Sequence, residues 1–139
     1  MISVALLAAL LLTACSRQPV YPAPATSGRN AVIDVAALKP EVPQFYTYSF
    51  KGKNISFFVI KLNAQVLSFL DACASCYPHK MGYRYEDGAV ICRECNLRFS
   101  VYKLKQGIGG CFPIHIESST EKGRYLIPLA ALEAHAEKF

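Results

Sequence analysis

The sequence predicts a mainly β fold of the α+β class, a small antiparallel β domain with a zinc-ribbon-like pair of cysteine turns and a C-terminal helix. Three observations lead to this prediction. Short runs rich in aromatic and β-branched residues alternate with turn residues. A pair of cysteines separated by two residues occurs twice. A run of Ala, Leu, Glu and Lys follows Pro128 at the C-terminal end, where proline suits the first turn of a helix.

The composition indicates one folded domain. The chain has 139 residues, of which 53% are hydrophobic and 12% aromatic, and these values exclude a wholly disordered protein. The formal net charge of +5 is modest, and the basic residues are scattered without a run of five or more like charges. We therefore expect no nucleic-acid partner.

The first fourteen residues contain no charged side chain and are mostly Leu, Ala, Val and Ile. This run is shorter than the roughly 20 residues that a membrane-spanning helix needs, and it predicts a signal peptide at residues 1–14. Leu12-Thr13-Ala14-Cys15 then resembles the lipobox of bacterial lipoproteins, so Cys15 is the predicted lipidation site. The alternative is a buried N-terminal helix with an incidental cysteine. Export would place the protein in the cell envelope, on the periplasmic or extracytoplasmic face, held to the membrane by lipid.

Residues 15–43 are predicted to be the lipidated N-terminus and an extended tether, because prolines recur there among small and polar residues. Within this stretch, residues 30–38 contain Val32, Ile33 and Val35 and favour one short strand. The cysteine-rich metal-binding domain is predicted to begin at Gln44 and to extend over residues 44–139.

The strands of this domain are predicted from its β-forming runs and its turns. A three-strand meander is expected from the runs at 45–50, 55–60 and 65–71, and it leads directly into Cys73. Between the cysteine pairs, an Asp-Gly turn at 87–88 predicts a hairpin of residues 83–85 and 89–91. The remaining expected elements are a strand in 97–104, a glycine-rich loop at 106–110, short strands at 114–117 and 124–127 joined by a polar turn, and a helix at 129–138.

The two cysteine pairs carry the strongest functional signal. Cys73 and Cys76 are followed by fifteen residues and then by Cys92 and Cys95. Four thiolates in two tight turns are the number that a tetrahedral zinc, a single iron or an iron-sulfur cluster requires. The spacing alone favours zinc, its commonest interpretation, and leaves iron or reversible disulfides as alternatives. Asn96 follows the second pair and suits the left-handed backbone that such turns use.

Cys111 makes the four-cysteine interpretation incomplete. It follows two glycines, and it could replace one ligand, serve a second centre, or remain a free thiol. Without Cys15, the chain has five cysteines, an odd number that cannot all pair as disulfides within one chain. His79 could add a nitrogen ligand but is more simply an exposed loop residue. Tyr83 and Tyr85 could shield a cluster from solvent, or they could serve only for packing.

The ordered combination of these motifs resembles the FtrD-like family of membrane iron-sulfur proteins, which belongs to bacterial iron-transport systems. The resemblance covers residues from about Phe45 to about Ile127. It rests on four motifs: Asp71-Ala72-Cys73-x-x-Cys76, Gly82-Tyr83, Ile91-Cys92-x-x-Cys95 and Gly109-Gly110-Cys111-x-Pro113. The resemblance implies an iron-sulfur or related metal centre at Cys73, Cys76, Cys92 and Cys95, with Cys111 as a further candidate. It also implies redox partnership with an iron permease.

The sequence therefore predicts an exported, lipid-anchored protein whose iron-sulfur cluster or iron carries electrons, or handles metal, beside an iron-uptake system. Cys73, Cys76, Cys92 and Cys95 are the predicted metal ligands, and Cys111 is a fifth ligand or an exchange position. A non-enzymatic role is favoured, because no Ser/His/Asp arrangement or phosphate-binding loop is recognisable. Two alternatives stay open: a binding module with a structural zinc ribbon, and a thiol-disulfide protein without metal.

Overall fold

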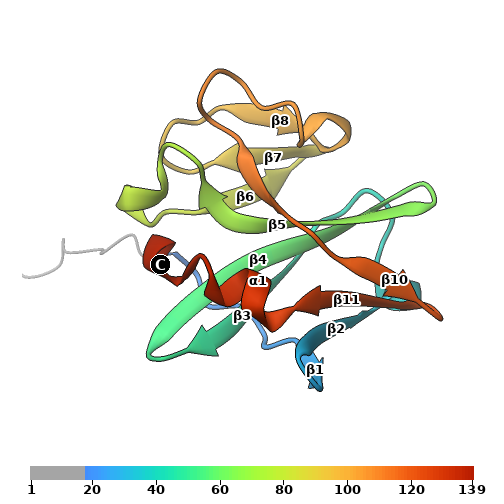
Figure 1. Cartoon of the computed structure of the whole chain (residues 1–139). Helices are drawn as coiled ribbons and strands as arrows, with labels where there is room; N and C mark the ends of the chain where they lie inside the picture. The colour runs from blue at the N-terminus through green and yellow to red at the C-terminus, as the bar shows by residue number, and fades with distance from the viewer. Residues whose placement is uncertain (1–17) are drawn as a thin grey trace, which may run out of the picture.

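The computed structural model describes residues 18–139 and contains three antiparallel sheets (Figure 1). We call them the outer, central and cysteine sheets. The outer sheet has the order β1 (Ala25–Ser27), β2 (Asn30–Asp34), β11 (Arg124–Pro128) and β10 (Ser119–Glu121). The central sheet has the order β3 (Gln44–Phe50), β4 (Lys53–Leu62), β5 (Gln65–Cys73) and β9 (Pro113–Ile116). The cysteine sheet has the order β6 (Tyr83–Glu86), β7 (Ala89–Cys92) and β8 (Arg98–Ser100).

The central sheet is covered on both faces, and β4 shows why. Side chains alternate between the two faces of a strand. Phe57 and Val59 therefore enter one core with residues of the outer sheet, while Phe58 and Ile60 enter a second core with residues of the cysteine sheet. Because both faces are buried, six successive residues of β4 are buried. The fold is thus a stack of three sheets with two separate cores (Figure 1).

The mainly antiparallel fold with a C-terminal helix is confirmed. β3, β4 and β5 form the predicted meander, and their antiparallel registers run through consecutive residues. β6 and β7 form the predicted hairpin, in which Asp87 and Gly88 have positive φ angles of 48° and 75°. Positive φ at both central residues is the backbone of the turn that suits the twist of a two-residue hairpin.

Two predicted elements are shorter than expected. β8 ends at Ser100, whose hydroxyl accepts a hydrogen bond from the Tyr102 amide and starts the 3-10 turn η3 (Val101–Lys103). The C-terminal helix α1 covers only Leu129–Glu133, and a 3-10 turn, η4 (Ala136–Lys138), follows it. The other 3-10 turns are η1 (Val35–Ala37) and η2 (Tyr77–His79).

The fold begins well before the predicted boundary at Gln44. Residues expected in the tether form β1 and β2, and β2 pairs with β11 over five residues. Ala31, Ile33 and Leu38 are buried in the core beneath the outer sheet, so this segment contributes to the domain. The apolar alternation of a single strand is a weak signal when its partner lies about ninety residues later in the chain.

The predicted signal peptide and Cys15 lie outside the described residues. Among residues 18–139, no helix combines the length and the apolar character of a membrane span.

Candidate metal centre

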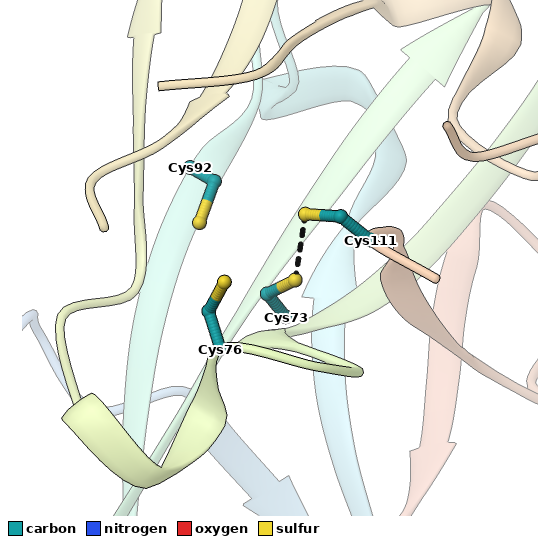
Figure 2. Close-up of side chains that lie close together, drawn as sticks. All are labelled: Cys73, Cys76, Cys92 and Cys111. Atoms are coloured by element: carbon teal, nitrogen blue, oxygen red, sulfur yellow. Dashed lines mark hydrogen bonds between the residues drawn. The ribbon is translucent and has the colours of Figure 1, made fainter. Parts of the chain in front are cut away.

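Four cysteines converge beside the second core. Cys73, Cys76, Cys92 and Cys111 come from three separate segments, and their sulfur atoms all lie within 4.8 Å of one another. Figure 2 shows the four sulfurs pointing toward a shared centre. Cys73, Cys92 and Cys111 are buried and Cys76 is half-buried, and all are free thiols. The fold therefore brings the predicted cysteine motifs to one place.

Strand ends fix two of the four cysteines. Cys73 is the last residue of β5 and pairs with Pro113 of β9, next to an irregularity in the strand register. The Ala74 amide donates to the Phe112 carbonyl at 3.0 Å, which ties the first cysteine turn to the segment that carries Cys111. Cys92 is the last residue of β7 and pairs with Tyr83 of β6. The centre thus lies where the central sheet meets the cysteine sheet.

The second cysteine turn has the backbone that the sequence predicted. Asn96 has a φ of 58°, and its amide donates to the Cys92 carbonyl at 2.9 Å. The Cys92 amide donates in turn to the Leu97 carbonyl at 3.1 Å. Cys95 lies on the exposed side of this turn, with its sulfur 3.5 Å from that of Cys111.

The inner set of four differs from the ligand set predicted from the two pairs. It includes Cys111, the predicted fifth position, while Cys95 lies at the exposed rim with its sulfur 3.5 Å from that of Cys111. Spacing identifies cysteines that share a turn, but it cannot place a cysteine that arrives from a loop some fifteen residues later. Cys111 is buried and its sulfur is 2.7 Å from that of Cys73 (Figure 2).

The loop before Cys111 needs glycine for a steric reason. Gly107 has a φ of +66°, and a Cβ atom there would lie 2.7 Å from the Cβ of Phe112. The Ile108 and Cys111 amides and carbonyls exchange hydrogen bonds of 2.9 and 3.1 Å, which close the loop just before it reaches the centre. The glycine-rich stretch expected at 106–110 is therefore a compact turn that delivers Cys111.

A buried acid, Asp71, was missed as a site residue although its motif was noted. It is 1% exposed, and its carboxylate accepts hydrogen bonds from the Tyr83 amide at 2.6 Å and from the Gln18 side chain at 2.7 Å. A Cβ atom at Gly82 would lie 2.8 Å from both carboxylate oxygens, so only glycine allows this approach. Asp71 thus joins β5, β6 and the N-terminal segment behind the centre.

Burial raises the pKa of Asp71 to about 6. Hydrogen bonds from Gln18 and the Tyr83 amide, and the charge of Arg93, lower this pKa and only partly offset burial. Arg93 also donates from Nε to the Tyr83 carbonyl at 3.0 Å. Both backbone groups of Tyr83 are therefore held by charged side chains, which fixes the start of β6 beside the cysteines.

The Tyr83 side chain lies against the centre. It is fully buried, with its ring edge-on to Phe58 and Phe99. Its hydroxyl has no hydrogen-bond partner among the described residues. Burial raises its pKa far above the ordinary value, and the neighbouring Cys73 thiol adds to this shift. Tyr83 therefore covers the buried side of the sulfurs, while Tyr85 is half-buried at the edge of the same core.

Among the inner cysteines, the Cys73 thiol has a pKa below its ordinary value. Burial raises the pKa of Cys73, but hydrogen bonds from the Cys111 thiol and from the Ser75 hydroxyl and amide outweigh burial and bring it to about 6. At the rim, burial likewise opposes ionisation, but the Leu97 amide and neighbouring thiols lower the pKa of Cys95 below its ordinary value.

The other inner thiols are held protonated by burial. Burial raises the pKa of Cys92 to about 12 and raises the pKa values of Cys76 and Cys111 as well. Because metals bind the thiolate form, a bound ion would displace these protons. Metal binding should therefore release protons and weaken at low pH.

The spacing of the sulfurs fits one four-coordinate ion. Four sulfurs around an ion with metal–sulfur bonds of about 2.3 Å form a tetrahedron with edges of about 3.8 Å. That edge lies between the shortest inner pair, 2.7 Å, and the 4.8 Å limit of the whole set. Four cysteine thiolates are also the ligand set of iron-sulfur clusters.

The histidines lie outside the inner set. His79 is an exposed loop residue, as expected, with its imidazole 3.5 Å from Glu94. His115 packs edge-on against Phe69 on the central sheet. Among the described residues, the close group of potential ligands at this centre consists of cysteine sulfurs.

Residues 38–139 match a protein-family model described as membrane iron-sulfur containing protein, FtrD-like. The matched range includes the five cysteines of the centre and its rim. A comparison with curated proteins found no match. The family match and the cysteine cluster together indicate a metal-binding protein associated with iron transport.

Proposed function

Because the chain belongs to the FtrD-like family of membrane iron-sulfur containing proteins, we propose that it is a lipid-anchored, one-electron carrier of a bacterial iron-uptake system. Its redox centre is a single iron held by the thiolates of Cys73, Cys76, Cys92 and Cys111. The observation that supports this most is the convergence of four sulfurs, from three segments, within 4.8 Å.

Iron in four thiolates supplies a reversible one-electron couple. The protein contributes the surroundings that set the potential: burial, charge and hydrogen bonds to the sulfurs. Three of the inner cysteines are packed among the aromatic and aliphatic residues of the second core. This apolar shell favours the less charged, oxidised state, and it excludes water from the buried side.

The exposed edge of the centre supports transfer to a partner. Cys76 is half-buried and Cys95 is exposed, whereas Cys73, Cys92 and Cys111 are buried. A narrow pocket lined by Cys73, Cys76 and Cys92 also opens at this edge. A redox partner can therefore approach the sulfur of Cys76 while the opposite side stays dry.

The proposed function includes a membrane anchor and a membrane partner. A lipid on Cys15 would keep the domain at the membrane, on the extracytoplasmic face of the envelope, beside an iron permease. If this is correct, Cys15→Ser shifts the protein from the membrane fraction to the soluble fraction and leaves its metal content unchanged. Retention of the variant in the membrane fraction would contradict the lipid anchor.

The redox role is tested on the full chain purified without oxygen. We expect bound iron, a visible absorption band of ferric thiolate, and reversible loss of that band on one-electron reduction in a potential titration. Cys92→Ser should abolish the band, whereas the exposed control Ser100→Ala should keep it. A protein without a reversible couple would contradict the electron-carrier role.

The same geometry also fits a structural zinc ion, which is the second candidate function. One zinc per chain, no colour and a fold that depends on the ion would support a zinc-stabilised binding module. The third alternative, a thiol-disulfide protein, requires a change in the number of titratable thiols on reduction and no bound metal.

A further inference from the structure

The centre has one more sulfur than a four-coordinate ion can use. Cys95 is exposed, and its sulfur lies 3.5 Å from that of Cys111. The other four sulfurs already form a complete inner set. The surplus thiol also neighbours the thiols of Cys76 and Cys92, so it touches the inner set at the side open to solvent.

Cys111 differs from the other buried ligands in how the fold holds it. Cys73 and Cys92 end strands β5 and β7, so their backbones are fixed by the sheets. Cys111 follows the glycine-rich loop, at an isolated bridge with Ile108 outside the sheets. In the loop, Gly109 and Gly110 have no atom within 4 Å of an added Cβ position, so this turn faces open space on that side. Cys111 is the buried ligand that can move with the least disturbance of the sheets.

An ion enclosed by four ligands leaves slowly if a bond must break first, because a buried thiolate would then be left unpaired. A fifth thiolate beside the site offers another route. One metal–sulfur bond forms to Cys95 while another breaks at Cys111, so the ion keeps four ligands. The Cys95 thiol gives its proton to water, and the released Cys111 thiolate takes one up.

We propose that Cys95 is the exchange ligand of this centre. It replaces Cys111 while a thiophilic divalent ion enters or leaves, and Cys111 completes the set once the ion is seated. The proposal rests on the metal-binding part of the proposed function and is independent of electron transfer.

The test uses zinc as the probe ion on the full chain. The chain is loaded with one zinc, and the rate of transfer to a coloured chelator in excess is measured. Cys95→Ser should still bind one zinc but release it slower by about tenfold or more. Glu121→Gln, a charge change at an exposed residue of β10 in the outer sheet, is the control and should leave the rate unchanged.

Alkylation provides a second measurement. In the zinc-loaded chain, iodoacetamide should modify Cys95 ahead of the four inner cysteines, as located by peptide mass spectrometry. Cys111→Ser should bind zinc more weakly than Cys95→Ser does, because it removes a member of the inner set.

Three outcomes would overturn the exchange role. If Cys95→Ser loses zinc as completely as Cys73→Ser, Cys95 is a permanent ligand. If it releases zinc at the wild-type rate, Cys95 takes no part in exchange. A wild-type chain that binds no ion would overturn metal binding and the exchange role together, whereas a redox-inactive chain that exchanges zinc as described would overturn electron transfer alone.

Discussion

The two faces of the central sheet are stabilised by different means. On one face, the outer sheet and α1 close a core of aliphatic and aromatic side chains that contains no cysteine among the described residues. On the other, the cysteine sheet has strands of only four, four and three residues, and its core includes Cys73, Cys92 and Cys111. A sheet of such short strands is marginal by itself. One side is therefore held by packing alone, whereas the other also has a cysteine cluster that a bound ion would tie together.

The strand β5 belongs to both sides. Leu70 faces the core beneath the outer sheet, whereas Cys73, three residues later and past the irregularity in register, faces the metal centre. The central sheet therefore fixes the first cysteine without metal, and an ion bound there would tie the cysteine sheet to the central sheet.

The largest expected effect comes from a substitution in the core beneath the outer sheet, which contains no metal ligand among the described residues. Phe57 is fully buried in the core beneath the outer sheet and stacks on Tyr46 at 5.5 Å. Phe57→Ala should lower the free energy of unfolding by about 3–5 kcal/mol, with or without metal. Denaturant unfolding followed by circular dichroism measures this. The exposed Phe112→Ala serves as a control and should cost under about 1 kcal/mol; equal losses in the two variants would refute the scaffold role.

Metal removal should destabilise the cysteine sheet more than the central sheet. At a free-ion concentration about 100 times the dissociation constant, binding stabilises the folded state by about 2.7 kcal/mol. We expect a chelator to speed amide hydrogen exchange in β6, β7 and β8 while β4 and its pairing with β5 stay protected. Uniform loss of protection across all three sheets would show that the sides are not separate.

Asp71 links the two sides, so its removal should have an intermediate effect. Asp71→Ala leaves the Tyr83 amide without its acceptor, reduces Gln18 to its bond with the carbonyl of residue 71, and should cost about 2 kcal/mol. Asp71→Asn keeps one carbonyl acceptor and should cost less. Both values come from denaturant unfolding of the metal-loaded chain, and an Asp71→Ala variant as stable as the wild type would exclude this link.

The smallest expected effect on stability is at Tyr83. Its hydroxyl has no hydrogen-bond partner within residues 18–139 and lies beside the sulfurs, so Tyr83→Phe should change the free energy of unfolding by less than about 1 kcal/mol. In the iron-loaded protein, loss of an O–H group that can donate to a thiolate should lower the reduction potential. A potential titration of the two proteins checks this. An unchanged potential would show that Tyr83 contributes packing alone.

The sequence predicted the local features of this molecule well. The meander before Cys73, the Asp87-Gly88 hairpin and the backbone of Asn96 each depend on residues close together in the chain, and each is present. The pairing of β2 with β11 was missed because its two strands lie far apart in the sequence. Part of the segment predicted as a tether therefore forms a strand of the outer sheet.

The same division applies to the metal centre. The two-residue spacing predicted which cysteines share a turn, and all five cysteines do gather at one place. It could not show that Cys111 is inside and Cys95 outside, because this depends on how the loop after Leu104 folds back over β5. The sequence showed Asp71 only as part of a motif. Its role could not be predicted, because it depends on contacts with Tyr83 and Gln18 from other segments.

The most direct test of the single-ion centre is the metal and acid-labile sulfide content of the full chain purified without oxygen. We expect one iron per chain and no acid-labile sulfide. One zinc in place of iron would support the four-thiolate centre and exclude the electron-carrier role, because zinc has no redox couple. Several irons with matching sulfide would contradict the single-ion centre, because the four sulfurs would then have to surround a cluster.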